Sequence, residues 1–281
     1  MISVIIPTFN RAEFLKEAIQ SVLDQNYFRG LDTARLFEII VVDDGSTDNT
    51  EQSLREFASC ITYLRQSANR GVSAARNKGI EIAAAPWIAF LDSDDYWLEE
   101  KLSVQMEFVK QHPATVACQT EEIWIRGGKR VNPKRRHQKP SGDIFKASLE
   151  LCLVSPSSVM IKRSVLDEIG PFDETLPAAE DYDLWLRISC RYPIQLIKKK
   201  LVVKEGGRRD QLSRQIASMD RFRIRALVKL IRSGILSPEQ RSAALEQLAL
   251  KCKIYGTGCM KRGRTTEARW YLSLPERIGI G

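Results

Sequence analysis

Three carboxylates stand close together at one point of this sequence and could bind a cation. Asp92, Asp94 and Asp95 directly follow the apolar residues 88–91. Like charges this close stay ionised together at low cost only when a cation lies among them. Asp92 and Asp94 are separated by one residue, so in an extended segment both side chains point the same way. Their oxygens suit Mg²⁺ or Mn²⁺ carrying a substrate phosphate, and a solvated turn that caps the next helix is the alternative.

A second acidic pair could supply a general base. Glu180 and Asp181 open the stretch EDYDLWLRI, in which Leu184 and Ile188 are spaced as on one face of a helix. The helix dipole by itself favours acidic side chains at this end. A carboxylate at a helix start can also remove a proton from a substrate hydroxyl. The residues alone leave both interpretations open.

Strands and helices must position these side chains. The apolar residues 88–91 are typical of a buried strand of a parallel sheet, and open α/β sheets bind ligands at the carboxyl ends of such strands. Further strands are predicted at 3–7, 37–42, 61–64, around 115–118, around 123–125, at 157–161 and at 194–203. Helices are predicted at 14–22, from 72 onward, and at 98–109, 164–170, 180–188, 211–232 and 238–255. Alternating strands and helices indicate βαβ units.

The loops after the first two strands carry side chains that suit a nucleotide. Thr8 and Asn10 could cap the next helix, and the Phe9 ring could meet a base. The second strand ends in Asp43 and Asp44, which could accept hydrogen bonds from a ribose or a base N–H, or only cap a helix. Neither GxGxxG nor GxxxxGK[ST] occurs here, which disfavours a dinucleotide fingerprint and a P-loop.

Basic side chains accompany these acidic loops. The planar fork of Arg76 could meet a phosphate or a base carbonyl, or form a salt bridge with an aspartate. Residues 126–142 are strongly basic and rich in Gly and Pro, which predicts a loop near the mouth of the site. This loop could touch an anionic acceptor or only be solvated.

Composition places the chain among globular proteins. It has 281 residues, of which 43% are hydrophobic and 28% charged. No apolar run approaches the roughly 18–20 residues of a membrane helix, and the chain begins in a strand-like run without a signal peptide pattern. The six cysteines lack CxxC spacing, so free thiols in a reducing cytoplasm are expected and a zinc site is not.

The net charge of +8 is unevenly distributed. From Lys198 to the end there are 20 Lys and Arg against 7 Asp and Glu. We interpret 206–281 as a basic helical extension, separate from a domain at 1–205. A basic amphipathic helix could lie on an anionic membrane surface, or it could only pack on its own domain. The basic tail would also suit a nucleic-acid-binding protein, but no such motif is present, and no nucleic acid is expected as a partner.

Five stretches together resemble family 2 of the inverting, nucleotide-sugar-dependent glycosyltransferases with the GT-A fold. Their order and spacing match as well. The resemblance implies a Rossmann-like, mostly parallel central sheet flanked by helices, followed here by a C-terminal helical extension. The stretches are SVIIPTFNR at 3–11, VVDDGSTD at 41–48, NRGVSAARNKGI at 69–80, FLDSDD at 90–95 and EDYDLWLRI at 180–188.

The resemblance also implies roles for individual residues. Asp94, with Asp92, would hold Mn²⁺ or Mg²⁺, and Asp181, with Glu180 beside it, would be the catalytic base. The predicted nucleotide-binding residues are Pro7, Thr8, Phe9, Asn10, Asp43, Asp44, Asn69, Arg76, Asp92, Ser93 and Arg208.

The expected activity is sugar transfer from a nucleotide-sugar, with UDP favoured, to a saccharide or lipid-linked acceptor. The protein is expected in the cytoplasm, with peripheral contact to the inner membrane face through the basic C-terminal helices. Related enzymes often carry a metal-binding histidine after the last strand, where this chain has Arg208 and Asp210. A catalytically silent nucleotide-sugar binder therefore stays an alternative, and a pyrophosphorylase is disfavoured because it would need a Gly-rich N-terminal loop.

Overall fold

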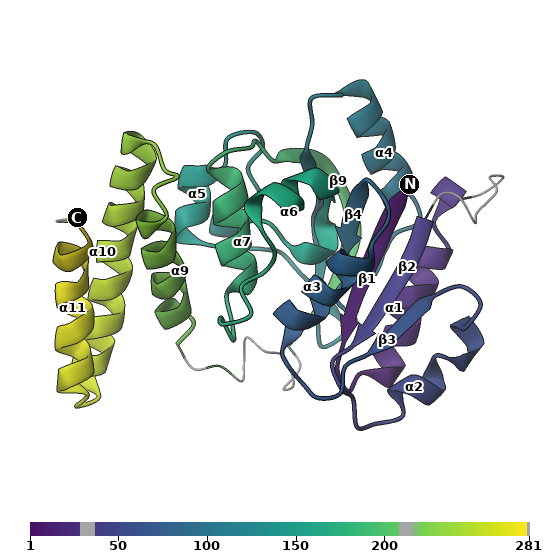
Figure 1. Ribbon diagram of the computed structural model, residues 1–281, viewed down its shortest axis with the longest axis horizontal. Helices are drawn as coiled ribbons and strands as arrows, with labels where there is room; N and C mark the ends of the chain where they lie inside the picture. Colours follow the sequence, from purple (N-terminus) through teal and green to yellow (C-terminus); the bar gives the residue numbers. More distant parts are fainter. Residues whose placement is uncertain (29–36, 208–215, 217, 280–281) are drawn as a thin grey trace.

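The structure is a computed structural model that describes residues 1–28, 37–207, 216 and 218–279 (Figure 1). Its first half alternates strands with helices. The strands are β1 (Ile2–Thr8), β2 (Phe37–Asp43), β3 (Thr62–Arg65) and β4 (Trp87–Phe90), and the helices are α1 (Ala12–Leu23), α2 (Thr50–Ser53) and α3 (Val72–Ile82), with the 3-10 turns η1 (Asn26–Phe28) and η3 (Arg55–Phe57). Parallel pairing of β1 with β2 and β4, and of β2 with β3, brings their carboxyl ends to one edge.

The sheet continues beyond β4 with antiparallel pairing. Its order is β3-β2-β1-β4-β8-β6-β9-β5, and β7 pairs with β6. Strands β4 and β8, β8 and β6, β9 and β5, and β6 and β7 are antiparallel, whereas β6 and β9 are parallel. The added strands are β5 (Asp95–Trp97), β6 (Ala117–Arg126), β7 (Lys129–Val131), β8 (Val159–Lys162) and β9 (Gln195–Gly206).

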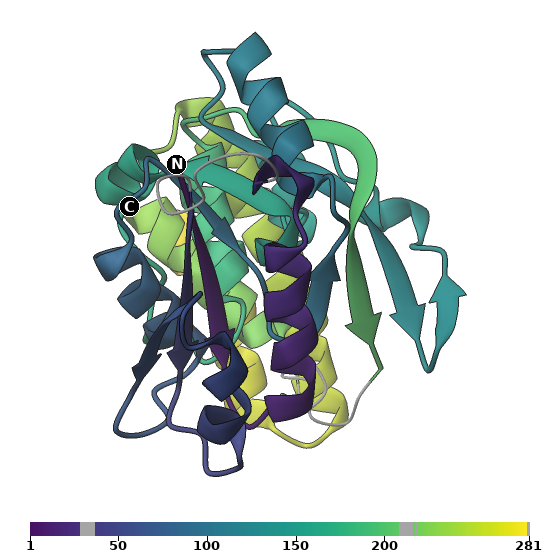
Figure 2. The same ribbon diagram turned by 90° about the vertical axis from the view of Figure 1, so that its right-hand side faces the viewer.

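One predicted pair of strands forms a single element. The separate strands expected near 115–118 and 123–125 are wrong, because β6 runs unbroken from Ala117 to Arg126. The polar residues between the two apolar runs stay in the strand, since they pair with β9 across register shifts at Thr120/Glu121 and Glu121/Glu122. Bulges of this kind bend a strand and re-aim its side chains. Figure 2 shows β9 curving beside β6.

Helices cover both faces of the sheet because successive side chains of each strand point to opposite faces. Val4 and Ile6 pack with Leu15 of α1 on one face. Ile5 packs with Ala75 of α3 and Trp185 of α7 on the other. The remaining helices and turns are α4 (Lys101–Gln111), η4 (Arg135–His137), α5 (Phe145–Glu150), η5 (Pro156–Ser158), α6 (Arg163–Ile169), α7 (Glu180–Ser189), α9 (Asp220–Arg232), α10 (Pro238–Lys261) and α11 (Thr265–Gly279).

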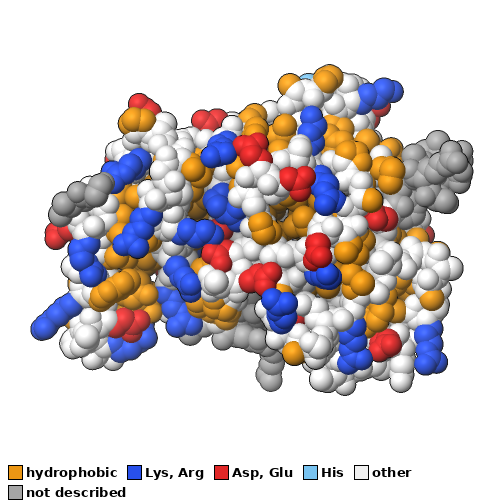
Figure 3. Space-filling model, in the orientation of Figure 1, with side chains coloured by type: hydrophobic (Ala, Val, Ile, Leu, Met, Phe, Trp, Pro, Cys, Tyr) orange, Lys and Arg blue, Asp and Glu red, His pale blue; other side chains and the backbone are white. Residues whose placement is uncertain are grey.

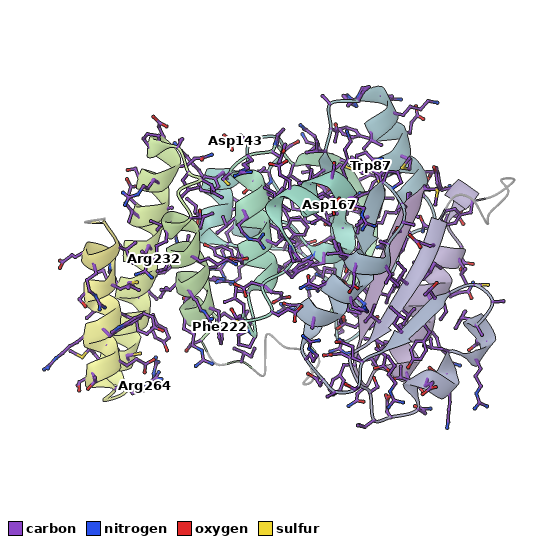
Figure 4. All side chains as sticks on the ribbon, viewed as in Figure 1. Trp87, Asp143, Asp167, Phe222, Arg232 and Arg264 are labelled. Carbon is purple, nitrogen blue, oxygen red and sulfur yellow. The ribbon has the colours of Figure 1, made fainter. Side chains whose placement is uncertain are left out.

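The C-terminal helices share a core with the first part of the chain. Phe222 and Leu227 of α9 are buried in one cluster with Phe145 of α5 and with Tyr182 and Leu186 of α7. Helix α9 therefore supports α7 directly. Helices α10 and α11 lie beyond it at the end of the molecule, and Arg264, labelled in Figure 4, lies at the turn between them.

Two basic side chains of α9 point to the body of the protein. Lys229 Nζ contacts carboxylate oxygens of Asp173 at 2.7 Å and of Asp183 at 2.9 Å. Arg225 donates to the carbonyl and hydroxyl oxygens of Thr175. These two basic side chains of the predicted C-terminal extension therefore hold the segment that leads into α7.

Gly79 permits close packing of α3 on β1. A Cβ atom added there would lie 2.4 Å from Cγ2 of the buried Ile5. We expect Gly79→Ala to lower the free energy of unfolding in urea by about 1–3 kcal/mol, because overpacking forces the core to shift. Gly258→Ala in α10 is the matched control. Its Cβ would meet only the flexible end of Arg262, so no loss is expected there. Equal effects of both substitutions would contradict the packing role of Gly79.

Candidate active site

A cavity of about 1800 Å³ opens at the carboxyl ends of β1, β2 and β4. Of the predicted site residues, Asp43 does not line it, and Arg208, like Asp210, lies outside the described residues. The structure thus brings most of the predicted residues to one space. Those that line it are Pro7, Thr8, Phe9, Asn10, Asp44, Asn69, Arg76, Asp92, Ser93, Asp94, Glu180 and Asp181.

Asn10 and Asp43 fix the loops that border the cavity. The Asn10 carboxamide oxygen accepts hydrogen bonds from the backbone N–H groups of Thr47 and Asp48. The backbone N–H of Asn10 donates to the Ser46 hydroxyl. Asn10 has a φ of +52°, a conformation that asparagine tolerates better than most residues. The Asp43 carboxylate accepts from the Ser46 N–H and, at 2.7 Å, from the Tyr63 hydroxyl. Both oxygens of Asp43 therefore have partners within the protein.

Asp44 holds the turn before α3. Its carboxylate accepts hydrogen bonds from the backbone N–H groups of Arg70 and Gly71, both at 2.8 Å, and from the Gln66 side chain at 2.9 Å. Burial raises its pKa, and the two backbone hydrogen bonds oppose that rise. Asp44 remains on the cavity wall, so it could still meet a ligand there.

Arg76 links two acidic parts of the site. Its guanidinium contacts Asp92 Oδ1 at 2.7 Å and Glu180 Oε1 at 2.8 Å, and its side chain is only 4% exposed. Burial acts to raise the pKa of Asp92, but the charges of Arg76, Lys204 and Arg11, with the Arg76 hydrogen bond, together leave that pKa lowered. Burial, helped by the neighbouring Asp181, keeps the pKa of Glu180 raised despite Arg76. Arg76 thus forms the salt bridge that was one of its two predicted roles, and its ion pairs join α3 to the loop after β4 and to the start of α7.

Each carboxylate of the 92–95 cluster meets a cationic side chain. Arg11 pairs with Asp94, and Lys204 of β9 lies 3.7 Å from Asp95. Asp95 also accepts a 2.6 Å hydrogen bond from the Ser157 hydroxyl, and burial raises its pKa to about 7. The like charges are thus balanced by three cations that come from different parts of the chain.

Asp92 and Asp94 also fit a divalent cation. The described part of the chain has no group of three or more His, Cys, Asp or Glu side chains arranged to hold a metal. Mg²⁺ at nucleotide sites usually needs only one or two carboxylates, because substrate phosphates complete its shell. Both aspartates offer oxygen ligands on the cavity wall, which matches that requirement.

Asp181 differs from its neighbour Glu180. It is partly exposed on the cavity wall, and no ion pair reaches it within the described ranges. Ala179, which precedes the pair, has a φ of +59°, a strained conformation of the kind found at functional sites. Asp181 is therefore the carboxylate of this pair that a ligand can reach.

Three buried polar atoms on the cavity wall lack a partner among the described residues. They are Thr8 Oγ1, Ser73 Oγ and Arg76 Nε. An unsatisfied buried polar group costs about 1–3 kcal/mol, so such groups call for an explanation. A polar ligand that supplies the missing hydrogen bonds is one.

Several residues of the site were not predicted from the sequence. Arg11, Cys152 and Lys204 all line the cavity. The pKa of the Cys152 thiol is raised by burial and further by Asp181 beside it. For Lys204, the available signal was its position directly after the predicted strand 194–203, whereas nothing local marked Cys152.

The described residues include no helix that is both long and apolar enough to span a bilayer. All six cysteines are free, as predicted. Lys and Arg side chains are spread over the C-terminal helices on the face shown in Figure 3.

The fold resembles those of solved glycosyltransferases. S. aureus TarS 1-349 in complex with UDP-GlcNAc matches with a TM-score of 0.72 and 21% identity, over 90% of this chain and 71% of that one. The mannosyltransferase PcManGT from Pyrobaculum calidifontis, in complex with GDP-Man and Mn²⁺, matches with a TM-score of 0.65 and 19% identity, over 98% of this chain and 85% of that one. These likenesses establish the predicted GT-A fold.

The family follows from the sequence. The sequence-family model described as Glycosyl transferase family 2 matches residues 3–170 of the chain. The chain therefore belongs to that family. A relative from Escherichia coli is the UDP-Glc:alpha-D-GlcNAc-diphosphoundecaprenol beta-1,3-glucosyltransferase WfgD, 31% identical over 67% of this chain and 69% of that protein. An uncharacterized glycosyltransferase of Rickettsia felis is 32% identical over 71% of this chain, which corresponds to only 32% of that relative. The chain thus matches about a third of the length of the latter.

Proposed function

We propose that this protein transfers a sugar from a UDP-sugar to a saccharide or lipid-linked acceptor with inversion at the anomeric carbon. The observation that carries the proposal is the cavity itself. It joins the carboxylates of Asp92 and Asp94, three unsatisfied polar atoms and the accessible Asp181. The UDP-sugars named for TarS and WfgD favour UDP, and the lipid diphosphate named for WfgD favours a lipid-linked acceptor.

The donor would occupy the end of the cavity formed by the β1 and β2 loops. Phe9 is 39% exposed there and offers a ring face to a base. Thr8 Oγ1 and Arg76 Nε would gain hydrogen bonds from the nucleotide. Asp44 would accept a hydrogen bond from the base, while Asp43 would support it by holding the loop. Pro7, Asn10, Asn69 and Ser93 would complete the wall.

Asp181 would act as the general base. An acceptor hydroxyl becomes a good nucleophile only when its proton is removed during attack. Attack on the face opposite the leaving group would invert the anomeric centre, with one base on that face as in inverting hydrolysis. Glu180 would position Arg76 and Asp92, because its carboxylate is already bound to the guanidinium.

Asp94 and Asp92 would hold Mn²⁺ or Mg²⁺. When bound, the ion supplies charge stabilisation to the departing nucleoside diphosphate. Arg11 would help, since it lies beside Asp94 and a guanidinium pairs well with phosphate oxygens. Arg208, predicted to contact the nucleotide, stays a prediction.

Asp94→Ala tests the metal role. We expect Mn²⁺ to strengthen UDP binding to the wild type, and we expect this gain to fall by at least about tenfold in the variant, since a metal ligand is lost. Isothermal titration of UDP with Mn²⁺ and with a chelator measures it. The ratio of the two affinities is the readout, because the substitution also releases Arg11. Asp167→Ala, on α6 in Figure 4, is the control. An unchanged ratio in Asp94→Ala would exclude its role as a ligand.

We also propose peripheral contact of the C-terminal helices with an anionic membrane surface, at the inner face of the membrane. Residues 216–279 contain 13 Lys and Arg against 5 Asp and Glu. Electrostatic attraction to anionic lipid would bring the protein to a lipid-linked acceptor. Cosedimentation with anionic vesicles but not with neutral ones is expected at low salt, and equal behaviour with both would exclude this contact.

A further inference from the structure

The cavity is larger than a single ligand needs. Small-molecule sites usually measure about 300–1000 Å³, whereas this space measures about 1800 Å³. Its other wall comes from β6, β9 and the loop after β7. Strand β9 is four strands from β1 in the order of the sheet, although its residue Lys204 reaches the acidic cluster and lies 3.7 Å from Asp95. Figure 2 shows β6, β7 and β9 away from β2 and β3. We call this the β6–β9 wall, defined by Trp124, Arg126, Pro133, His137, Lys198 and Lys200.

Trp124 is fixed at this wall by a buried polar network. Its indole Nε1 donates to Glu122 Oε2 at 2.9 Å. Lys139 Nζ donates to the other oxygen of Glu122 at 2.9 Å, and also to the Ser158 hydroxyl and the Thr120 carbonyl. A side chain held in this way presents a pre-oriented ring to the cavity.

His137 meets Trp124 edge-on. The ring centroids are 5.4 Å apart with planes at 63°, so the two rings form a corner rather than a stack. Aromatic rings combine a large apolar face with a polar edge and suit ligands that have both characters. The apolar C–H face of a sugar ring is such a ligand, and its hydroxyls would remain free for hydrogen bonds.

Three consecutive lysines of β9 are used differently. Lys199 Nζ pairs with Glu100 Oε2 at 2.7 Å, away from the cavity. Lys198 and Lys200 line the cavity and are exposed, and no ion pair reaches either one in the described part of the chain. These lysines lie at the register shift between Thr120/Ile197 and Glu121/Lys200, where a bulge re-aims side chains of β9. Glu121 is opposite Lys200 in register but does not pair with it there.

We propose that the β6–β9 wall binds the acceptor, a saccharide carried on a diphosphate, with the sugar against Trp124 and the diphosphate at Lys198 and Lys200. The inference rests on the proposed function, which leaves this end of the cavity for the second substrate. Ammonium groups are effective phosphate partners, and no carboxylate of the described residues is bound to either of these two. The donor diphosphate would instead meet the divalent ion held by Asp92 and Asp94. The two substrates would therefore present their anionic groups to different cations, the metal ion for the donor and the two lysines for the acceptor.

Calorimetric titration of the full chain with defined probes tests this assignment. The protein is first saturated with UDP and Mn²⁺. The main probe is N-acetylglucosamine linked through a diphosphate to a short alkyl chain. The corresponding alkyl glycoside without phosphate and inorganic pyrophosphate separate the contributions of the sugar and the anion. The variants are Lys198→Gln/Lys200→Gln, Trp124→Ala and, as the matched control, Lys199→Gln.

The double lysine variant is expected to bind the main probe at least about tenfold more weakly, since charge-assisted hydrogen bonds are lost. It should bind the phosphate-free glycoside as the wild type does. Trp124→Ala should weaken both glycosides and leave pyrophosphate binding unchanged, and Lys199→Gln should alter none of them. UDP affinity should stay the same in all variants.

Three results would overturn the assignment. One is equal binding of the main probe by the double variant and Lys199→Gln. Another is a loss of UDP affinity in the double variant, which would move these lysines to the donor. The third is no binding of the main probe by wild-type protein that still binds UDP. Failure of the wild type to bind any nucleotide would instead contradict the proposed function.

Discussion

Asp181→Asn is expected to reduce sugar transfer by about 10²–10⁴-fold while nucleotide binding stays intact. Asparagine has nearly the same shape but cannot take the proton of the acceptor hydroxyl. Asp181 makes no ion pair within the described residues, so its replacement should disturb the fold little. Release of UDP from a panel of UDP-sugars, with water and with the diphosphate-linked sugar as acceptors, measures the effect.

Two comparisons make this result specific. Asp167→Asn, an exposed aspartate of α6, should keep full activity. UDP titration of Asp181→Asn should match the wild type, because the donor contacts lie on other loops. Turnover within a few-fold of the wild type would exclude Asp181 as the base. A wild type that binds UDP-sugars but never releases UDP would instead favour the silent binder.

Arg76→Met is expected to destabilise the fold by about 3–5 kcal/mol, measured by urea unfolding at neutral pH. The substitution keeps most of the aliphatic volume but leaves Asp92 and Glu180 without their shared cation. Breaking one partner of a buried ion pair costs far more than losing a surface pair, because the remaining charge stays desolvated. Arg191→Met is the control, since Arg191 pairs with Glu168 at the exposed surface and its loss should cost about 1 kcal/mol or less.

The pH dependence of Arg76→Met should have a definite sign. Without Arg76, the pKa values of the buried Asp92 and Glu180 in the folded state should rise above their unfolded values. The folded variant would then bind more protons than the unfolded chain, so its deficit relative to the wild type should grow as pH rises and shrink under mildly acidic conditions. Glu180→Gln added to Arg76→Met should recover part of the stability. A loss no larger than that of Arg191→Met would contradict the role of Arg76 as a buried link.

The sequence predicted the parallel half of the sheet because its strands are mostly apolar runs, interrupted only by Ser3 and Glu38. Residues 3–7, 37–42 and 88–91 can be buried on both faces only in such a sheet, and the polar residues that follow each run must then meet at one edge. The one-residue spacing between Asp92 and Asp94 and the acidic residues at the start of α7 can likewise be seen in the local sequence. The GT-A fold and the family were predicted from the resemblance of the five motif stretches to family 2, which these local patterns do not specify by themselves. The short elements β5, β7 and α5 were not predicted, because so few residues show no clear period. The longer helix α11 was also not predicted, and it contains Pro275, which usually breaks a helix.

Only the tertiary structure decided which charges meet. Arg76 is 104 residues from Glu180, and their contact separates the buried Glu180 from the accessible Asp181. Likewise, Asp43 is used by Tyr63 and Ser46 inside the protein, whereas the adjacent Asp44 faces the cavity. The β6–β9 wall depends on a parallel pairing between strands about 77 residues apart in the chain, which no local pattern encodes. Apolar runs and local spacing reveal burial, but the partner of a charged side chain depends on which distant segments the fold brings beside it.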